Sequence, residues 1–267
     1  MNQNKSSDQG QGAPDPEIWS SLKTYWDTHL HDLQVVTSPV GSPAFFSQLD
    51  EYRFDKQRYL PPLVDFPSFR GRSVLEVGCG AGIDLMRFAR AGALVTGIDI
   101  SHTALDLARA YFGQQNQPAT LKRMNGEAMS FPDDCFDAVY CHGVLPYTPG
   151  PDVMVRELYR VLKPGGVAIV QTFNRRSWLN GLSKVMKVEL EHTDAPVSRL
   201  DRAGTFRAWF APFARVRFIT ERFPVKTRLQ TGAKAKLYNS FFVGPFNLLP
   251  RRWVAPLGWH LLARATK

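Results

Sequence analysis

The sequence predicts a doubly wound α/β fold, in which helices cover both faces of a mostly parallel sheet. Two observations predict it. Between residues 73 and 173, apolar segments of strand length alternate with amphipathic segments of helix length, which is the pattern of repeated βαβ units. A glycine-rich run follows the first apolar segment directly, where open α/β sheets bind their ligands. With two more strands near the carboxyl terminus, we expect a seven-stranded sheet.

Each element can be assigned from its own pattern. Apolar segments predict five strands, at residues 73–78, 94–100, 119–124, 136–141 and 166–173. Amphipathic segments predict helices at residues 84–92, 102–112, 152–162 and 205–213. Gly92 is expected to end the first of these helices, and Ser101 to cap the start of the second. Residues 214–223 and 257–265 predict the last two strands, paired as an antiparallel hairpin at one edge of the sheet.

The segments outside this pattern predict attachments to the main domain, which we place at residues 70–267. Residues 1–16 are polar and contain no apolar run, so we expect a disordered tail and no secretory signal. Residues 17–69 predict a helical extension that forms a lid, with helices at 18–33 and 44–60. Residues 174–200 have no clean period, and so long an irregular stretch predicts an insertion covering the ligand site.

The charge of the chain is unevenly distributed. Residues 1–167 contain 15 Lys and Arg against 19 Asp and Glu, whereas residues 168–267 contain 18 against 5. Such a basic region indicates an anionic partner or a solvated basic face.

The sequence contains no run of 18 apolar residues, so we expect no membrane-spanning helix. The three cysteines follow no metal-binding spacing. We expect a cytoplasmic protein without a bound metal.

The glycine-rich run, Glu76 to Gly82, indicates the cofactor. Its glycines lie at positions 78, 80 and 82, so it is not the dinucleotide motif GxGxxG, which would need glycine in place of Ile83. Asp99 ends the second strand, where a carboxylate can accept hydrogen bonds from both hydroxyls of a ribose. The negative charge of Glu76 opposes a pyrophosphate but suits a ligand with an ammonium and a sulfonium group. These features together predict S-adenosylmethionine.

Three segments resemble a known family. Residues 74–101, 126–147 and 156–170 are similar to motifs of the class I S-adenosylmethionine-dependent methyltransferases, in the type 11 group that includes the ubiquinone and menaquinone methyltransferases. The resemblance covers roughly residues 70–172 and implies a Rossmann-like fold.

The resemblance also implies roles for individual residues. The glycine loop would hold the methionine part of the cofactor, Asp99 the ribose, Ile100 and the amide of Ala128 the adenine ring, and Glu127 its exocyclic amine. Many relatives have Asp at the position of Glu127. The implied cofactor-binding residues are Glu76, Gly78, Cys79, Gly80, Gly82, Asp99, Ile100, Glu127, Ala128 and Cys141.

The acceptor side departs from the family pattern. Where relatives often read GVLHH, residues 143–147 read GVLPY, so Pro146 replaces a histidine. His142, at the tip of the fourth strand, is the first candidate for a general base, and a structural role is its alternative. His192, close in sequence to Asp194, is the second. Further acceptor-side candidates are Tyr25, His29, Tyr147 and Asp194.

We therefore expect methyl transfer to a small-molecule or lipid-like acceptor, with oxygen favoured over nitrogen or carbon. One alternative is an RNA-modifying enzyme that uses the basic region, although no RNA-binding signature is present and nucleic acid is not the expected partner. Another is a cofactor-binding protein without catalysis. Residues 241–259 combine Phe, Leu and Trp with two arginines, which is compatible with peripheral membrane contact.

Overall fold

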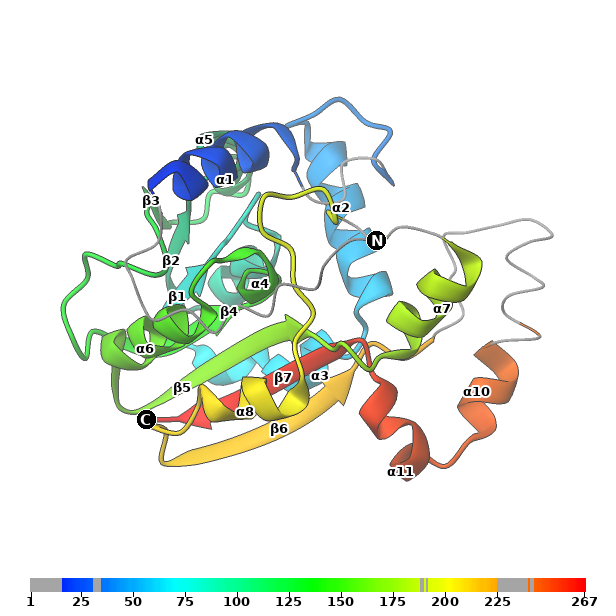
Figure 1. Ribbon diagram of the computed structural model, residues 1–267. Coiled ribbons are helices and arrows are strands. Elements are labelled where there is room, and N and C mark those ends of the chain that lie inside the picture. Colours follow the sequence, from blue (N-terminus) through cyan, green and yellow to red (C-terminus); the bar gives the residue numbers. More distant parts are fainter. Residues whose placement is uncertain (1–15, 31–34, 188–189, 191, 225–239, 241–242) are drawn as a thin grey trace.

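The computed structural model describes residues 16–30, 35–187, 190, 192–224, 240 and 243–267 (Figure 1). The expected disordered tail therefore lies outside the described residues, apart from Pro16, which begins the first helix.

The described residues contain the predicted seven-stranded sheet, in the order β3-β2-β1-β4-β5-β7-β6. Its first five strands are parallel, and β7 runs antiparallel to both β5 and β6. The strands are β1 Ser73–Val77, β2 Leu94–Asp99, β3 Thr120–Arg123, β4 Phe136–Cys141, β5 Leu162–Phe173, β6 Arg215–Glu221 and β7 His260–Thr266. The antiparallel pairing predicted for the last two strands is thus confirmed. Strand β6 forms the edge of the sheet, and β7 lies between β6 and β5.

Both faces of the sheet are buried under helices, because alternate strand residues pack into two separate cores. Val74 belongs to one core, which contains α2 and α4, while Leu75 belongs to the other, which contains α6 and α8. Helices α4 Ile83–Arg90, α5 His102–Gln114 and α6 Pro151–Val161 connect the parallel strands. Ser101 caps α5 as predicted, since its hydroxyl accepts a hydrogen bond from Ala104 N.

The amino-terminal extension contains α1 Pro16–Thr28, α2 Pro43–Lys56, α3 Leu60–Val64 and η2 Phe66–Phe69. The prediction of a single helix over residues 44–60 was wrong. Pro61 has no N–H to donate to the carbonyl of Gln57, so Leu60 N bonds that carbonyl instead and a new short helix begins. The predicted helix at 18–33 ends at Thr28, and residues 31–34 lie outside the described part.

Two expectations for the carboxyl-terminal region were also wrong. Residues 174–200 contain a helix, α7 Trp178–Met186, which Ser177 caps by accepting a hydrogen bond from Asn180 N. The helix expected at 205–213 is α8 Ala203–Ala208, since Pro212 cannot bond back to the carbonyl of Ala208.

The remaining helices are α10 Gly244–Leu248, α11 Arg251–Val254, η3 Leu145–Tyr147 and η5 Ala255–Leu257. Helices α7, α10 and α11 lie together at one end of the molecule, away from α1 and α5 (Figure 1). No helix among the described residues is both long and apolar enough to cross a membrane.

Candidate functional site

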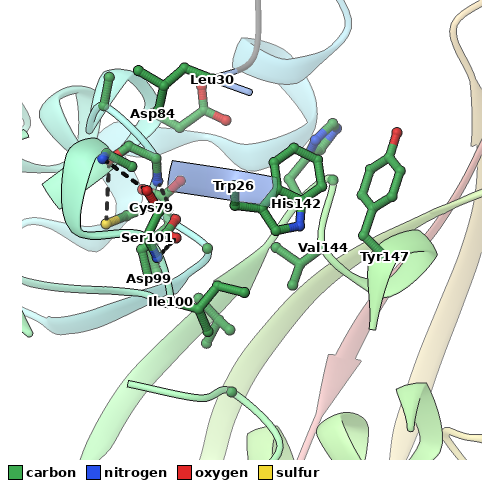
Figure 2. A pocket seen from close by; sticks show the side chains of 18 of the residues that line it. Trp26, Leu30, Cys79, Asp84, Asp99, Ile100, Ser101, His142, Val144 and Tyr147 are labelled. Carbon is green, nitrogen blue, oxygen red and sulfur yellow. Dashed lines mark hydrogen bonds between the residues drawn. The ribbon is translucent and has the colours of Figure 1, made fainter. Parts of the chain in front are cut away.

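A cavity of about 230 Å³ lies at the carboxyl ends of β1, β2 and β4, beneath α1 (Figure 2). This is far more space than a bound water needs, so the cavity suits an organic ligand. Its wall includes the glycine loop after β1, the tip of β2, the loop after β3, and residues from α1 and α2. The start of β7 and the residue after β6 complete it.

The glycine loop forms one wall of the cavity because its backbone adopts conformations that side chains disfavour. Gly78, Gly80 and Gly82 all have positive φ, of 70°, 53° and 79°. A Cβ on Gly78 would lie 2.2 Å from Cγ2 of Val144, whereas one on Gly80 would meet nothing within 4 Å. Because Gly80 also lines the cavity, its missing side chain leaves room there for a ligand. Gly82 does not line the cavity.

Asp99 joins the end of β2 to this loop. Its Oδ2 accepts a hydrogen bond from Gly80 N at 2.9 Å, and its Oδ1 accepts one from Ser101 N at 2.9 Å. Burial raises the pKa of Asp99, and these amide hydrogen bonds oppose the rise. Each oxygen retains a lone pair for a further donor, so the carboxylate can accept two ligand hydroxyls.

Glu76 lines the cavity and carries a buried carboxylate oxygen, Oε2, with no hydrogen-bond partner in the described structure. Burial, together with nearby Asp84 and Asp99, holds the pKa of Glu76 well above its usual range, and the Arg53 guanidinium opposes the rise. A buried carboxylate without a partner is costly unless a cation binds beside it. Glu76 is therefore suited to a cationic ligand group.

The loop after β3 contributes Asn125 to the cavity wall, together with Met124 and Gly126. Glu127 and Ala128, which were predicted to contact the adenine, are not among the lining residues, although Oε2 of Glu127 is buried without a hydrogen-bond partner among the described residues. The Oε1 of Glu127 accepts hydrogen bonds from the Thr148 hydroxyl and from Gly150 N, the latter at 2.6 Å. The position directly after the third strand is the signal that could have identified Asn125.

Among the other predicted cofactor-side residues, Ile100 and Cys79 line the cavity. Cys141 is fully buried and does not. Burial raises the pKa of both thiols, so neither is a thiolate at neutral pH.

A chain of buried and half-buried polar side chains lies along the cavity, and we call Asp84, Arg53, His142, Tyr59, His260 and Arg222 the polar chain. All of these residues except Tyr59 line the cavity. Arg53 binds Asp84 through two hydrogen bonds, of 2.9 Å and 2.5 Å. Its Nη2 lies 3.2 Å from His142 Nδ1, and His142 Nε2 lies 3.0 Å from the Tyr59 hydroxyl. The same hydroxyl contacts His260 Nδ1, and Arg222 Nη1 lies 3.2 Å from His260 Nε2.

Proton positions in the polar chain follow from the two arginines, because a guanidinium can only donate. His142 Nδ1 and His260 Nε2 must accept, so the other nitrogen of each neutral ring donates to Tyr59. The Tyr59 hydroxyl then donates to Gln57 Oε1 at 3.0 Å. Burial and the Arg222 charge keep the pKa of His260 well below its usual value, in agreement with a neutral ring. Both ring nitrogens of His142 are thus engaged, although the ring itself lines the cavity.

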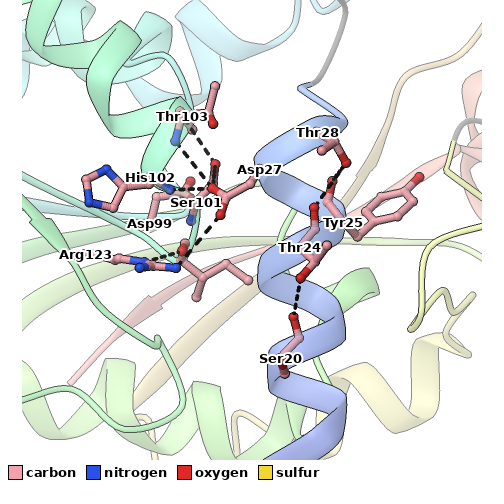
Figure 3. Close-up of polar contacts among 12 residues, drawn as sticks. Ser20, Thr24, Tyr25, Asp27, Thr28, Asp99, Ser101, His102, Thr103 and Arg123 are labelled. Carbon is pink, nitrogen blue, oxygen red and sulfur yellow. Dashed lines mark hydrogen bonds and ion pairs between the residues drawn. The ribbon is translucent and has the colours of Figure 1, made fainter.

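Helix α1 covers the cavity and is attached at the start of α5 (Figure 3). Oδ1 of Asp27 accepts hydrogen bonds from the Ser101 hydroxyl at 2.9 Å and from His102 N at 2.6 Å. These bonds lower the pKa of Asp27, although burial opposes the change. Trp26 and His29 of the same helix line the cavity.

The remaining predicted residues meet behind this helix. The Tyr25 hydroxyl donates to Asp194 Oδ1 at 2.9 Å and lies 3.0 Å from His192 Nδ1. The His192 ring packs against Trp26 and Tyr147, with centroids 5.0 Å and 6.0 Å away. Tyr147 lines the cavity, but Tyr25, His192 and Asp194 do not, nor does any other described residue of 174–200. The described residues of 174–200 therefore contact α1 and do not line the cavity that the sequence predicted them to cover.

Comparison with known sequences matches residues 75–170 to a methyltransferase domain. A ubiquinone biosynthesis O-methyltransferase of Pseudomonas entomophila strain L48 is 32% identical over 145 residues, which are 49% of this chain and 62% of that protein. One of Alkalilimnicola ehrlichii is 40% identical over 106 residues, covering 39% of this chain and 43% of the relative. The chain thus spans less than two thirds of the length of these curated relatives.

Solved structures share the fold at low sequence identity. The magnesium protoporphyrin IX methyltransferase of Synechocystis PCC 6803, solved with bound SAH, covers 93% of this chain and 99% of its own, with a TM-score of 0.59 and 16% identity. The PH0226 protein of Pyrococcus horikoshii OT3 covers 91% and 98%, with a TM-score of 0.57 and 15% identity. These likenesses confirm the predicted fold class.

Proposed function

We propose that this protein, whose residues 75–170 belong to the type 11 group of class I methyltransferases, transfers a methyl group from S-adenosylmethionine to a small-molecule acceptor. The observation that carries the proposal is the pair of carboxylates at the tips of β1 and β2. Glu76 has an unpartnered oxygen beside the cavity, and Asp99 faces the same space from the next strand.

The residues present fit this cofactor. Glu76 would hold its ammonium group, Asp99 its ribose hydroxyls, and the open face of Gly80 would accommodate its body. Ile100 and Asn125 would contact the adenine, because both line the cavity, Ile100 directly after Asp99 and Asn125 after Met124, whose N–H bonds the Asp99 carbonyl. When bound, S-adenosylmethionine supplies an electrophilic methyl carbon attached to a sulfonium.

The chain's own contribution to the reaction would be alignment and exclusion of water. Trp26 on α1 covers the cavity, and Tyr147 packs against it with a ring centroid distance of 5.0 Å. His142 would contact the acceptor through its ring, with its orientation fixed by Arg53 and Tyr59. Correct alignment of acceptor atom, methyl carbon and sulfur supplies much of the acceleration in such a displacement. Oxygen is the acceptor atom that we propose.

The cofactor assignment is tested by calorimetry with S-adenosylhomocysteine. The wild-type protein should bind it, and Asp99→Ala should weaken binding more than about tenfold because charge-assisted hydrogen bonds are lost. Asp106→Ala, which removes an exposed carboxylate from α5, is the matched control. Failure of the folded wild-type protein to bind would overturn the proposal.

The acceptor class is tested separately by transfer of a radiolabelled methyl group. The protein is incubated with labelled S-adenosylmethionine and a cell extract divided into small-molecule, lipid and RNA fractions. Label should enter the small-molecule or the lipid fraction. Label in the RNA fraction alone would support the RNA-modifying alternative and contradict ours.

We also propose that α10, α11 and η5 contact an anionic membrane surface. Leu248, Leu249, Trp253 and Leu257 are 86%, 45%, 64% and 37% exposed there. Arg252 is exposed beside Trp253, with its guanidinium carbon 6.0 Å from the ring centroid. Apolar and aromatic side chains beside basic ones favour the headgroup boundary, and the excess of basic residues after position 167 suits anionic lipid.

This contact is tested by cosedimentation with vesicles of phosphatidylglycerol or phosphatidylcholine. The wild-type protein should bind the anionic vesicles more strongly, and Leu248→Ser with Trp253→Ser should reduce binding. Val40→Ser removes a similarly exposed apolar residue elsewhere and should have no effect. Equal binding of both vesicle types would contradict the proposal.

A further inference from the structure

Arg222, directly after β6, is held in an unusual backbone conformation at the edge of the cavity. Its φ is 58°, in the left-handed region that an arginine rarely adopts. Its carbonyl accepts hydrogen bonds from Trp178 Nε1 at 2.9 Å and from Trp259 N at 3.4 Å. A strained residue persists only where its surroundings fix it, and such residues concentrate at functional sites. The two tryptophan contacts fix this conformation where Arg222 lines the cavity beside His260, and we call this part of the cavity wall the acceptor end.

Arg222 lines the cavity, and its guanidinium retains hydrogen-bond donors beyond the one that contacts His260. A guanidinium has five N–H donors in a fixed planar arrangement. Within the described residues, the side chain makes one hydrogen bond, from Nη1 to His260 Nε2 at 3.2 Å. Because His260 is a neutral ring at the end of the polar chain, this contact positions the guanidinium without neutralising its charge.

The charges that line the cavity differ along its wall. Glu76 and Asp99 lie at the tips of β1 and β2, whereas Arg222 follows β6 and contacts His260 at the start of β7. Arg53 is separated from Arg222 in the polar chain by His142, Tyr59 and His260. Asp84 neutralises Arg53 in their ion pair.

Arg222 supplies a cationic side chain at the acceptor end. The carboxylate adjacent to Arg222, that of Glu221, does not line the cavity. A cation at the end beside Glu76 and Asp99 and an anion at the acceptor end would therefore both be favoured.

Aromatic rings form the wall between these ends. Phe173 lines the cavity and stacks on His260, with centroids 5.7 Å apart and planes inclined by 30°. Tyr147 meets Phe173 edge-on at 5.9 Å. Flat apolar surfaces of this kind favour a planar ligand body.

On the basis of the proposed function, we propose that the acceptor is an aromatic acid whose carboxylate is bound by Arg222. The planar guanidinium matches a carboxylate through two parallel hydrogen bonds. The aromatic wall holds the ring, and the cofactor occupies the end beside Glu76 and Asp99. Arg222 is thus a determinant of acceptor specificity.

The test measures binding of benzoate, 4-hydroxybenzoate and 2-naphthoate by calorimetry, with saturating S-adenosylhomocysteine, and compares each with its methyl ester. The wild-type protein should bind at least one acid more than about tenfold more tightly than its ester. Arg222→Gly, which suits the positive φ, should fold normally by circular dichroism and lose this preference. Lys187→Gly removes a cation at another left-handed position, φ 54°, and should retain the preference.

The outcomes separate the two proposals. A protein that binds S-adenosylhomocysteine but prefers none of the acids would overturn the role of Arg222 and leave the proposed function standing. An unchanged preference in folded Arg222→Gly would do the same. A wild-type protein that binds no S-adenosylhomocysteine would overturn the proposed function itself.

Discussion

The two ends of the cavity are built in opposite ways. The cofactor end comes mainly from residues 76–101 and the loop after β3, and positive-φ glycines and backbone amides shape much of its wall. The acceptor end is built from side chains that come from distant parts of the sequence, such as Arg53, His142 and His260. A backbone-built wall changes little with most substitutions, whereas a wall of side chains can change its ligand through single replacements. The fold thus fixes the cofactor more firmly than it fixes the acceptor.

The largest expected effect is on the stability of the protein, when a side chain beside the acceptor end is changed. Tyr59→Phe removes the oxygen that both histidines bond, and takes this partner from the ring N–H of buried His260 and of half-buried His142. We expect the free energy of unfolding to fall by about 3 kcal/mol, since each unsatisfied buried donor costs roughly 1–3 kcal/mol. Urea denaturation measures the change. Tyr52→Phe, on α2, is the control and should alter stability by less than about 0.5 kcal/mol. Equal stability of the two variants would show that the polar chain does not hold the wall.

The next effect concerns the cofactor end. Glu76→Gln removes the carboxylate expected to bind the cofactor's ammonium group. Affinity for S-adenosylmethionine should fall about thirtyfold, since a hydrogen bond to a charged group contributes roughly 2 kcal/mol. Calorimetry gives the ratio, with Glu51→Gln, an exposed residue of α2, as the control. A fall of less than threefold would remove Glu76 from the cofactor site.

The effect of Glu76→Gln on the stability of the protein should depend on pH. Burial and nearby Asp84 raise the pKa of Glu76 in the folded protein above its unfolded value. The stability associated with the protonated form is therefore present at low pH and lost as the pH rises through the folded pKa. Without cofactor, Glu76→Gln should stabilise the protein more at pH 8 than at pH 5, as thermal unfolding would record. A gain that is the same at both values would contradict a raised pKa.

The smallest expected effect is on turnover, and it tests whether His142 contacts the acceptor but not the cofactor. His142→Ala should lower turnover roughly tenfold, because alignment of the acceptor is lost. Affinity for S-adenosylhomocysteine should change by no more than a few fold. Methyl-transfer rates and calorimetry give the two values, and His102→Ala, an exposed histidine on α5, is the control. An unchanged rate would leave His142 with a structural role only.

Predictions that depend on residues close together in the sequence were correct more often than those that depend on contacts between distant segments. The strands of the parallel sheet were predicted within a few residues, since each has a local apolar pattern between glycine-rich turns. The predicted helices at 44–60 and 205–213 were too long, because their apolar periodicity continues up to Pro61 and past Pro212, which lack the amide donor that a helix needs. Helix α7 was missed because Asn180 and Gly181 obscure its pattern.

The sequence by itself determined the fold, the glycine loop, and the carboxylates Glu76 and Asp99, because these depend on residues close together in the chain. Only the tertiary structure decided that Arg53, His142, His260 and Arg222 line one cavity, that Asn125 lines it too, and that His192 packs on Trp26 of α1. Contacts between distant segments depend on how helices and strands pack against one another. Local sequence patterns specify the elements, and the packing of those elements decides which side chains meet.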